Sequence, residues 1–159
     1  VVQVKGKKGE CSRNFMNPAI AMIKESSKIV LMSKNATKRE KRMIGTFRAH
    51  IKNMLKGVNN GQLYKLKVCS GHFPMNVSIT NGVLSVKNFL GEKYPRTLKI
   101  RPGVNVNING DIIEVESVDI ELAGAVATDL EKLTRIVNRD RRIFQDGIYI
   151  ISKPRKEIK

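Results

Sequence analysis

The chain has 159 residues and a formal charge of +16, because it carries 30 Lys and Arg against 14 Asp and Glu. A soluble enzyme core does not need this excess, so the composition indicates a polyanionic partner, with nucleic acid ahead of an anionic membrane. No apolar run approaches the ~20 residues of a membrane span, and no secretory signal is visible. We therefore expect a cytoplasmic protein that does not bind a membrane.

The first part of the chain predicts a series of short strands. Alternating and apolar segments place them at 1–5, 10–16, 19–24 and 28–33. Lys7 and Lys8, between Gly6 and Gly9, form the turn of the first hairpin. The second pair of strands is expected to turn at residues 25–27.

A basic amphipathic helix follows these strands. Thr37 and Glu40 have the spacing of a capping box, and the helix is expected to run to about Val58. Asn59-Asn60-Gly61 then supplies a left-handed cap. The apolar positions expected to face inward are Met43, Ile44, Phe47, Ile51, Met54, Leu55 and Val58, and the basic stripe on the other face is Lys38, Lys41, Arg42, Arg48, Lys52 and Lys56.

The second part of the chain predicts more strands and a second helix. The strands are expected at 65–68, 75–80, 83–87, 92–100, 104–108, 111–116 and 148–151. Asn81-Gly82 and Asn109-Gly110 are two-residue hairpin turns of the favoured kind. The helix is expected over 119–137, with inward positions Ala123, Val126, Ala127, Leu130, Leu133 and Val137. A basic loop, 138–147, separates this helix from the last strand.

An internal repeat organises these elements. Residues 1–10 (VVQVKGKKGE) match residues 83–92 (VLSVKNFLGE) in two Val, a Lys, a Gly and a Glu, and the helical segments 44–55 and 123–134 correspond in the same way. The repeat predicts an α+β protein of two similar modules, each with an antiparallel or mixed sheet and one packed helix. The expected divisions are a first module at 1–62 that lacks its N-terminal strands, a second module at 63–153, and a loose basic tail at 154–159.

Catalytic, metal and cofactor motifs are not found. The two cysteines, Cys11 and Cys69, stand outside any CxxC pair and are expected to be reduced thiols. His72 lies near Cys69, but no carboxylate is expected to orient it, and His50 is expected to be solvated or to face RNA. The sequence therefore predicts no enzyme activity, no metal and no cofactor.

Three basic places favour nucleic-acid binding: the turn with Lys5, Lys7 and Lys8, the helical stripe, and the loop with Arg139, Arg141 and Arg142. The loop arginines stand beside Phe144 and Tyr149, and such groups can bind phosphates and stack on unpaired bases. Any single cluster is equally well a solvated surface, but three clusters with a net charge of +16 favour a nucleic acid. Because aromatic residues are few, recognition of the backbone and shape of folded RNA is expected.

Several motifs closely resemble one family across nearly the whole chain. They are KGKKGE (5–10), GTFRAHIKNMLKGV (45–58), HFPMNV (72–77), NFLGEKYPR (88–96), RPG (101–103) and RDRRIFQDGIYI (139–150). Together they resemble the archaeal and eukaryotic branch of the large-subunit ribosomal protein L-six family, called L-nine in eukaryotic cytosolic ribosomes. The sequence departs from the family's pattern at the opening strand pair and at Asn59-Asn60-Gly61-Gln62.

The resemblance implies a non-catalytic constituent of the large ribosomal subunit. Its partners would be large-subunit ribosomal RNA near the sarcin–ricin stem, neighbouring ribosomal proteins, and translation GTPase factors at the nearby factor site. The RNA-facing residues it implies are His72, Lys93, Arg96, Arg139, Arg141, Arg142, Phe144 and Gly147, to which the charge pattern adds Lys153, Lys5, Lys7 and Lys8. The alternative hypothesis is a regulatory RNA- or DNA-binding module outside the ribosome.

Overall fold

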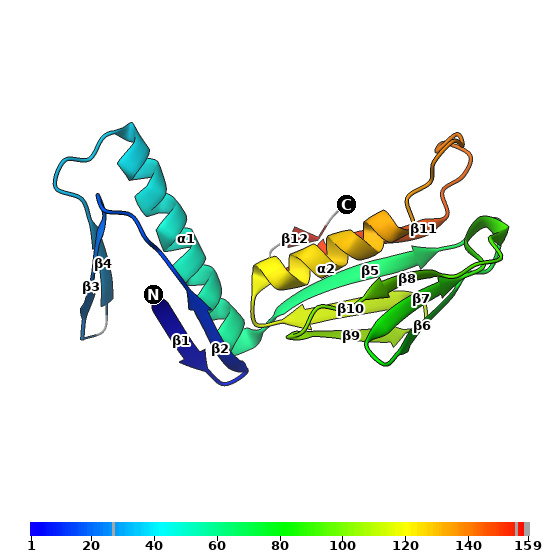
Figure 1. Cartoon of the computed structure of the whole chain (residues 1–159), viewed down its shortest axis with the longest axis horizontal. Helices are drawn as coiled ribbons and strands as arrows, with labels where there is room; N and C mark the ends of the chain where they lie inside the picture. Colours follow the sequence, from blue (N-terminus) through cyan, green and yellow to red (C-terminus); the bar gives the residue numbers. More distant parts are fainter. Residues whose placement is uncertain (27, 155, 158–159) are drawn as a thin grey trace. The chain divides into compact units, whose positions relative to one another are not determined.

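The chain folds as two compact units, Val1–Asn60 (unit 1) and Gly61–Lys159 (unit 2) (Figure 1). The structure is a computed structural model that describes residues 1–26, 28–154 and 156–157, the last two for their backbone only. In this part of the chain, no helix is long and apolar enough to cross a membrane.

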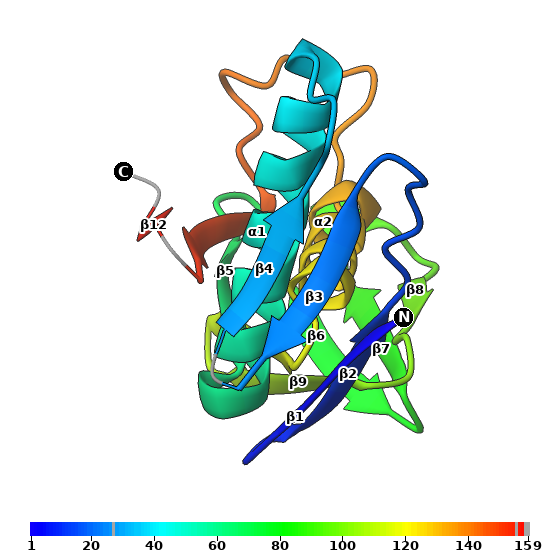
Figure 2. The same cartoon turned by 90° about the vertical axis from the view of Figure 1, so that its left-hand side faces the viewer.

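Unit 1 contains two antiparallel hairpins. Strand β1 (Val2–Gly6) pairs with β2 (Gly9–Arg13), and β3 (Ala21–Glu25) pairs with β4 (Lys28–Met32). Figure 2 shows the β3–β4 hairpin alongside the helix of this unit, α1. The strand predicted over 10–16 ends at Arg13, and Phe15 beyond it packs edge-on against Phe47 of the helix, with ring centroids 5.1 Å apart. One residue of the predicted 25–27 turn, Ser27, lies outside the described residues.

Helix α1 (Lys38–Asn60) begins at the predicted capping box. The Thr37 hydroxyl accepts a hydrogen bond from the Arg39 amide at 3.2 Å, and the Glu40 carboxylate accepts one from the Thr37 amide at 2.9 Å. The helix ends beside Gly61, whose φ of +77° provides the predicted left-handed cap. Phe47, Ile51, Met54 and Val58 are buried as expected.

Two predictions on α1 need correction or refinement. Leu55 was expected to face inward but is 45% exposed, because it lines an open hollow between α1 and the β3–β4 hairpin. His50 is not simply solvated, since its Nδ1 lies 3.1 Å from Arg13 Nη1.

The first hairpin is seated tightly on the C-terminal turn of α1. The Lys8 amide donates to the Val58 carbonyl oxygen at 2.8 Å. A Cβ atom at Gly6 would lie 2.7 Å from the same carbonyl oxygen, which is closer than van der Waals contact allows. Glycine at position 6 thus permits the close approach that positions the lysine-bearing turn.

Unit 2 contains two antiparallel sheets. The larger has the strand order β12-β11-β5-β10-β9 and the smaller the order β6-β7-β8. The larger is formed by β5 (Gln62–Cys69), β9 (Val104–Asn109), β10 (Ile112–Ser117), β11 (Gly147–Lys153) and β12 (Lys156–Glu157). The smaller is formed by β6 (Asn76–Thr80), β7 (Val83–Lys87) and β8 (Arg96–Lys99), with a short 3-10 turn, η1 (Phe89–Gly91), between the last two.

Helix α2 (Ile120–Leu133) covers the core of unit 2. Asp119 caps its start, with Oδ1 accepting from the Glu121 amide at 2.9 Å. Both sheets contribute buried side chains beneath the helix: Leu66, Val68, Leu84, Val86, Val104, Ile113, Val115 and Ile148 pack with Ala123, Val126, Ala127 and Leu130. The predicted helix over 119–137 was too long. Val137 is 68% exposed because the chain leaves the helix at Thr134.

Several strand boundaries in unit 2 differ from the prediction. The Asn81-Gly82 turn is confirmed, with φ values of +50° and +74°, whereas the next predicted turn is shifted by one residue to Gly110-Asp111. The strand predicted over 92–100 begins only at Arg96, and β5 and β11 are longer than predicted. Residues 156–157, placed in the loose tail, pair with β11; residues 155, 158 and 159 lie outside the described residues.

The order of elements repeats between the units. Hairpin β1–β2, hairpin β3–β4 and helix α1 correspond to β7–β8, β9–β10 and α2. The matching turn glycines Gly9 and Gly91 both have positive φ, at +141° and +80°. The matching helical glycines differ: a Cβ at Gly124 would lie 2.9 Å from the Tyr64 hydroxyl, but one at Gly45 would meet nothing within 4 Å.

The surroundings of Gly6 and Gly45 predict opposite effects of a Gly→Ala substitution at these two positions of unit 1. Gly6→Ala should destabilise unit 1 by about 1–3 kcal/mol, because its new methyl group overlaps the Val58 carbonyl. Gly45→Ala should stabilise unit 1 by about 0.5–1 kcal/mol, because alanine loses less backbone entropy than glycine when the helix forms and its Cβ would meet no atom within 4 Å. Urea unfolding followed by circular dichroism measures both changes. Equal shifts for the two variants would contradict the seating of the hairpin on α1.

Candidate nucleic-acid interface

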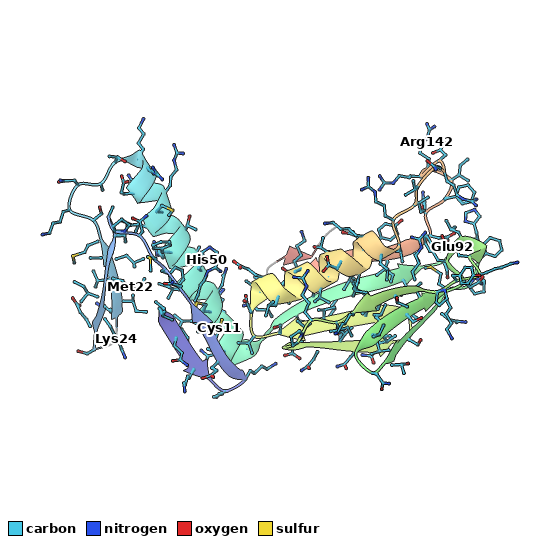
Figure 3. The ribbon with its side chains drawn as sticks, in the orientation of Figure 1. Cys11, Met22, Lys24, His50, Glu92 and Arg142 are labelled. Atoms are coloured by element: carbon cyan, nitrogen blue, oxygen red, sulfur yellow. The ribbon has the colours of Figure 1, made fainter. Side chains whose placement is uncertain are left out.

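Three connections meet at one end of unit 2. They are residues 70–75 after β5, residues 88–95 between β7 and β8, and residues 138–146 between α2 and β11, and together they are called the loop end. Figure 3 places Arg142 of the third connection and Glu92 of the second at this same end. The Asn88 side chain donates to the Pro74 carbonyl at 3.0 Å, and Gly91 packs against the Phe73 ring. Parts of the chain that are far apart in sequence thus form one surface.

The buried carboxylate of Asp146 joins the first connection to the third. This residue is 1% exposed. Its Oδ1 accepts hydrogen bonds from the Gly71 amide and, at 3.2 Å, from the His72 amide. Its Oδ2 lies 3.0 Å from Nδ1 of the His72 ring. The expectation that no carboxylate orients His72 was therefore wrong.

Hydrogen bonding decides the ionisation of this carboxylate. Burial alone would raise the pKa of Asp146, but the hydrogen bonds from the Gly71 amide, the His72 ring and the His72 amide together hold the pKa below its ordinary value. The carboxylate is therefore charged at neutral pH. Its charge is matched by donors that come from a segment more than seventy residues earlier in the chain.

Starting beside Asp146, the side chains of His72, Phe144 and Arg139 contact one another in series. The His72 ring lies on the Phe144 ring, with centroids 4.7 Å apart and an angle of 26° between the planes. The guanidinium of Arg139 lies 4.9 Å from the centroid of Phe144. Phe144 thus contacts both the imidazole and the guanidinium, and Arg139 is exposed at the surface.

Residues 138–146, called the arginine loop, are ordered by hydrogen bonds within the loop. The side chain of Asp140 accepts from the Arg142 amide at 2.9 Å and from the Arg142 guanidinium at 3.0 and 3.2 Å. These hydrogen bonds from Arg142 hold the pKa of Asp140 below its usual value. The Phe144 amide donates to the Asp140 carbonyl at 2.9 Å. The side chain of Arg142 nevertheless remains 91% exposed, so the edge of its guanidinium that Asp140 does not occupy is open to a phosphate.

Arg96 and Gly147 have structural roles in this chain. Arg96 forms a two-point ion pair with Glu92, at 2.6 and 2.8 Å, and donates to the Leu133 carbonyl at 2.7 Å. The pairing lowers the pKa of Glu92, and the Arg96 guanidinium also lies 4.3 Å from the Phe89 ring centroid. Gly147 is buried with a φ of +151°, and a Cβ there would lie 3.4 Å from the Thr134 carbonyl. Arg96 therefore ties β8 to the end of α2, and Gly147 lets β11 approach it.

The remaining candidate residues lie in three places. His72, Lys93, Arg139, Arg141, Arg142 and Phe144 are brought together at the loop end. Lys153 is exposed and is the seventh and last residue of β11. It therefore lies roughly 20 Å from the start of that strand, away from the loop end. Lys5, Lys7 and Lys8 belong to the β1–β2 hairpin of unit 1, where Lys5 pairs with Glu10 at 3.2 Å. Within unit 2, the structure thus unites six of the nine candidate residues.

Sequence reasoning missed three residues of this surface. Asp146 could not be recognised, because its partners Gly71 and His72 are distant in sequence. Phe73 is 47% exposed and Tyr94 is 86% exposed, although aromatic side chains usually bury most of their surface. The one available signal was the position of Tyr94 between Lys93 and Pro95, in a segment with turn character.

The described residues contain no cluster of three or more His, Cys, Asp or Glu side chains that could hold a metal ion. Cys69 and His72 line the same hollow, but no hydrogen bond joins them in the described part of the chain. The His72 ring instead contacts the Asp146 carboxylate and stacks on the Phe144 ring. The geometry therefore favours binding of a polyanion over a nucleophile–base pair.

Known proteins resemble this chain over most of its length. The family described as "Ribosomal protein L6" matches residues 1–61 and 73–147. The chain belongs to the ribosomal protein L6 family. A relative from Methanospirillum hungatei named "Large ribosomal subunit protein uL6" is 40% identical over 153 residues, which is 96% of this chain and 87% of the relative. Relatives of the same name from Methanococcus vannielii and Methanobrevibacter smithii are 44% and 42% identical, covering 91% and 96% of this chain and 79% and 85% of their own.

These relatives confirm the archaeal side of the resemblance. Two matched segments of the L6 family description agree with two similar α+β modules. The break between them, residues 62–72, contains β5 and the first residues of the loop end.

The Asp146 contacts predict a pH-dependent contribution to stability. Asp146→Ala should lower the free energy of unfolding at neutral pH by about 1–3 kcal/mol, because two amide donors lose their acceptor. Since the folded pKa is lowered, this contribution is fully present above pH ~4, the ordinary Asp pKa, and is lost as the pH falls through the folded value.

Urea unfolding of both proteins between pH 2 and pH 7 measures this difference. Asp140→Ala, which removes an exposed carboxylate from the same loop, is the matched control and should have a much smaller effect. A loss for Asp146→Ala that is the same at every pH would contradict the role given to the charged carboxylate.

Proposed function

We propose that this protein is a structural constituent of the large ribosomal subunit and binds its ribosomal RNA in the cytoplasm. The names of its archaeal relatives, the family to which it belongs and its charge of +16 support this role. The proposed role is binding and positioning, with no chemical reaction. Neighbouring ribosomal proteins are the other expected partners.

The loop end of unit 2 is the main RNA-binding surface in this proposal. The observation that carries it is the gathering of Lys93, Arg139, Arg141 and Arg142 with exposed aromatic rings, from connections that are distant in sequence. The cationic groups would neutralise phosphates and release counterions, so that affinity falls steeply with salt. The ordered hydrogen bonds of the loop reduce the entropy that is lost when RNA binds.

The finer assignment follows from the family resemblance. We place the loop end near the base of the sarcin–ricin stem, close to the site where translation GTPase factors bind. The stacked Arg139 and the tethered Arg142 would hold the RNA stem in register. Lys5, Lys7 and Lys8 of unit 1, and Lys153 of β11, would bind further phosphates outside the loop end.

Replacing Arg139, Arg141 and Arg142 together with Ala tests this proposal. Binding to large-subunit RNA from an archaeal relative should weaken, and the slope of log affinity against log salt should fall by about 1 for each phosphate that the variant no longer neutralises. Incorporation into large subunits and factor-dependent GTP hydrolysis should also fall. Binding is measured by filter retention across a salt series, and incorporation by sedimentation.

The matched control replaces Lys65, Lys99 and Arg101, three basic residues of unit 2 that lie outside the loop end. It removes the same charge and should lose less affinity. If both triple variants bind and incorporate equally well, the loop end is not the RNA surface. If the native protein does not sediment with large subunits at moderate salt, the ribosomal role itself is wrong and a module outside the ribosome is favoured.

A further inference from the structure

The loop end contains a hollow that the proposed function does not by itself explain. It has a volume of about 780 Å³, within the range of ~300–1,000 Å³ that is usual for small-molecule sites. The end of β5, the arginine loop and the start of β11 form its walls, with Cys69, His72, Arg141, Arg142, Asp146 and Tyr149 among the lining residues. A flat duplex-binding surface needs no such concavity.

The lining of this hollow is partly basic and partly aromatic. Arg141 and Arg142 are exposed, and the guanidinium of Arg142 pairs with Asp140. Tyr149 is 38% exposed, and its hydroxyl lies 3.4 Å from the Asp146 carbonyl oxygen. Arg141 and Tyr149 also line a second hollow of about 320 Å³, so together they form the partition between the two.

The wall is held in place before any ligand binds. The carboxylate of Asp146 accepts hydrogen bonds from the backbone amides of Gly71 and His72. The backbone carbonyl oxygen of Asp146 accepts a hydrogen bond from the Tyr149 hydroxyl. A phenol is protonated at neutral pH and able to donate, and burial raises the pKa of Tyr149 still further above its ordinary value. A rigid aromatic surface loses little entropy when a second ring stacks on it.

The ligand that matches this combination has a phosphate and a flat ring. The exposed arginines of the lining suit a phosphodiester, and the partly exposed tyrosine suits a nucleobase. Bases inside a duplex are stacked on their neighbours and cannot reach the floor of a pocket, whereas bases in bulges and loops can. The hollow therefore fits a nucleotide that lies outside a helical stack.

We propose that this hollow holds one unpaired nucleotide of the bound RNA, with its base against Tyr149 and its phosphate between Arg141 and Arg142. The proposal rests on the proposed RNA-binding function and adds to it. Contacts between the loop end and the RNA phosphates would form whether or not the bases are paired. The pocket would recognise a place where the RNA stem is interrupted, and so set the register of the protein along the stem.

The experiment uses two RNA hairpins of equal length, one with a single bulged 2-aminopurine and one fully paired. The native chain should bind the bulged hairpin about 5- to 100-fold more tightly, the range expected for stacking one base, and should change the 2-aminopurine fluorescence. Tyr149→Leu should abolish both the preference and the fluorescence change. Tyr149→Phe keeps the ring and should retain both, which separates stacking from a folding defect.

The outcomes distinguish this inference from the proposed function. Equal binding of both hairpins by the native chain, with steep salt dependence, would overturn the nucleotide pocket and leave RNA binding intact. An unchanged preference in Tyr149→Leu would also overturn it. Failure to bind either hairpin would overturn both proposals. Free AMP is the last probe: if it binds as tightly as the bulged hairpin, the pocket is a mononucleotide site and the assignment to RNA is wrong.

Discussion

The buried carboxylate of Asp146 is the interaction on which the loop end depends. It brings the amides of Gly71 and His72 against the segment that starts β11, although these residues are more than seventy positions apart. Its contact with the His72 imidazole also positions that ring against Phe144, the ring on which the Arg139 guanidinium lies. One desolvated negative charge thus positions a surface whose exposed groups are mostly positive.

The ion pair of Arg96 with Glu92 completes this framework from the other side. Arg96 also donates to the carbonyl oxygen of Leu133, the last residue of α2, where the helix leaves backbone acceptors unsatisfied. Cations near a helix C-terminus are also favoured by the helix dipole. A basic residue in an RNA-binding protein can therefore serve the fold, and here Arg96 orients the chain that enters the arginine loop.

The duplicated plan separates scaffold from function. In both units, two hairpins precede a helix, and a glycine with positive φ follows the matching first strand. The connections differ: a two-residue lysine turn joins β1 to β2, while residues 88–95 join β7 to β8 and carry the 3-10 turn, Lys93 and Tyr94. What is shared maintains the fold, and the longer connections of unit 2 provide the surface proposed for RNA.

The sequence by itself determined the features that depend on local chemistry. The capping box of Thr37 and Glu40, the Asn81-Gly82 turn and the buried face of α2 were predicted, because each depends on residues a few positions apart. The net charge indicated a nucleic-acid partner, and the sequence motifs indicated a ribosomal family; neither depends on the fold. Where local signals compete with packing, the predictions were wrong: Leu55 and Val137 are exposed, and the α2 helix ends early.

Only the tertiary structure decided how the candidate residues are grouped. No periodicity links Asp146 to Gly71, and the charge pattern did not distinguish the exposed Arg142 from the fully paired Arg96. Aromatic residues are few in the sequence, but the fold places Phe73, Tyr94, Phe144 and Tyr149 on or beside the loop end. Local patterns specify strands, turns and caps, whereas the burial of one carboxylate between distant segments is decided by the packing of the whole unit.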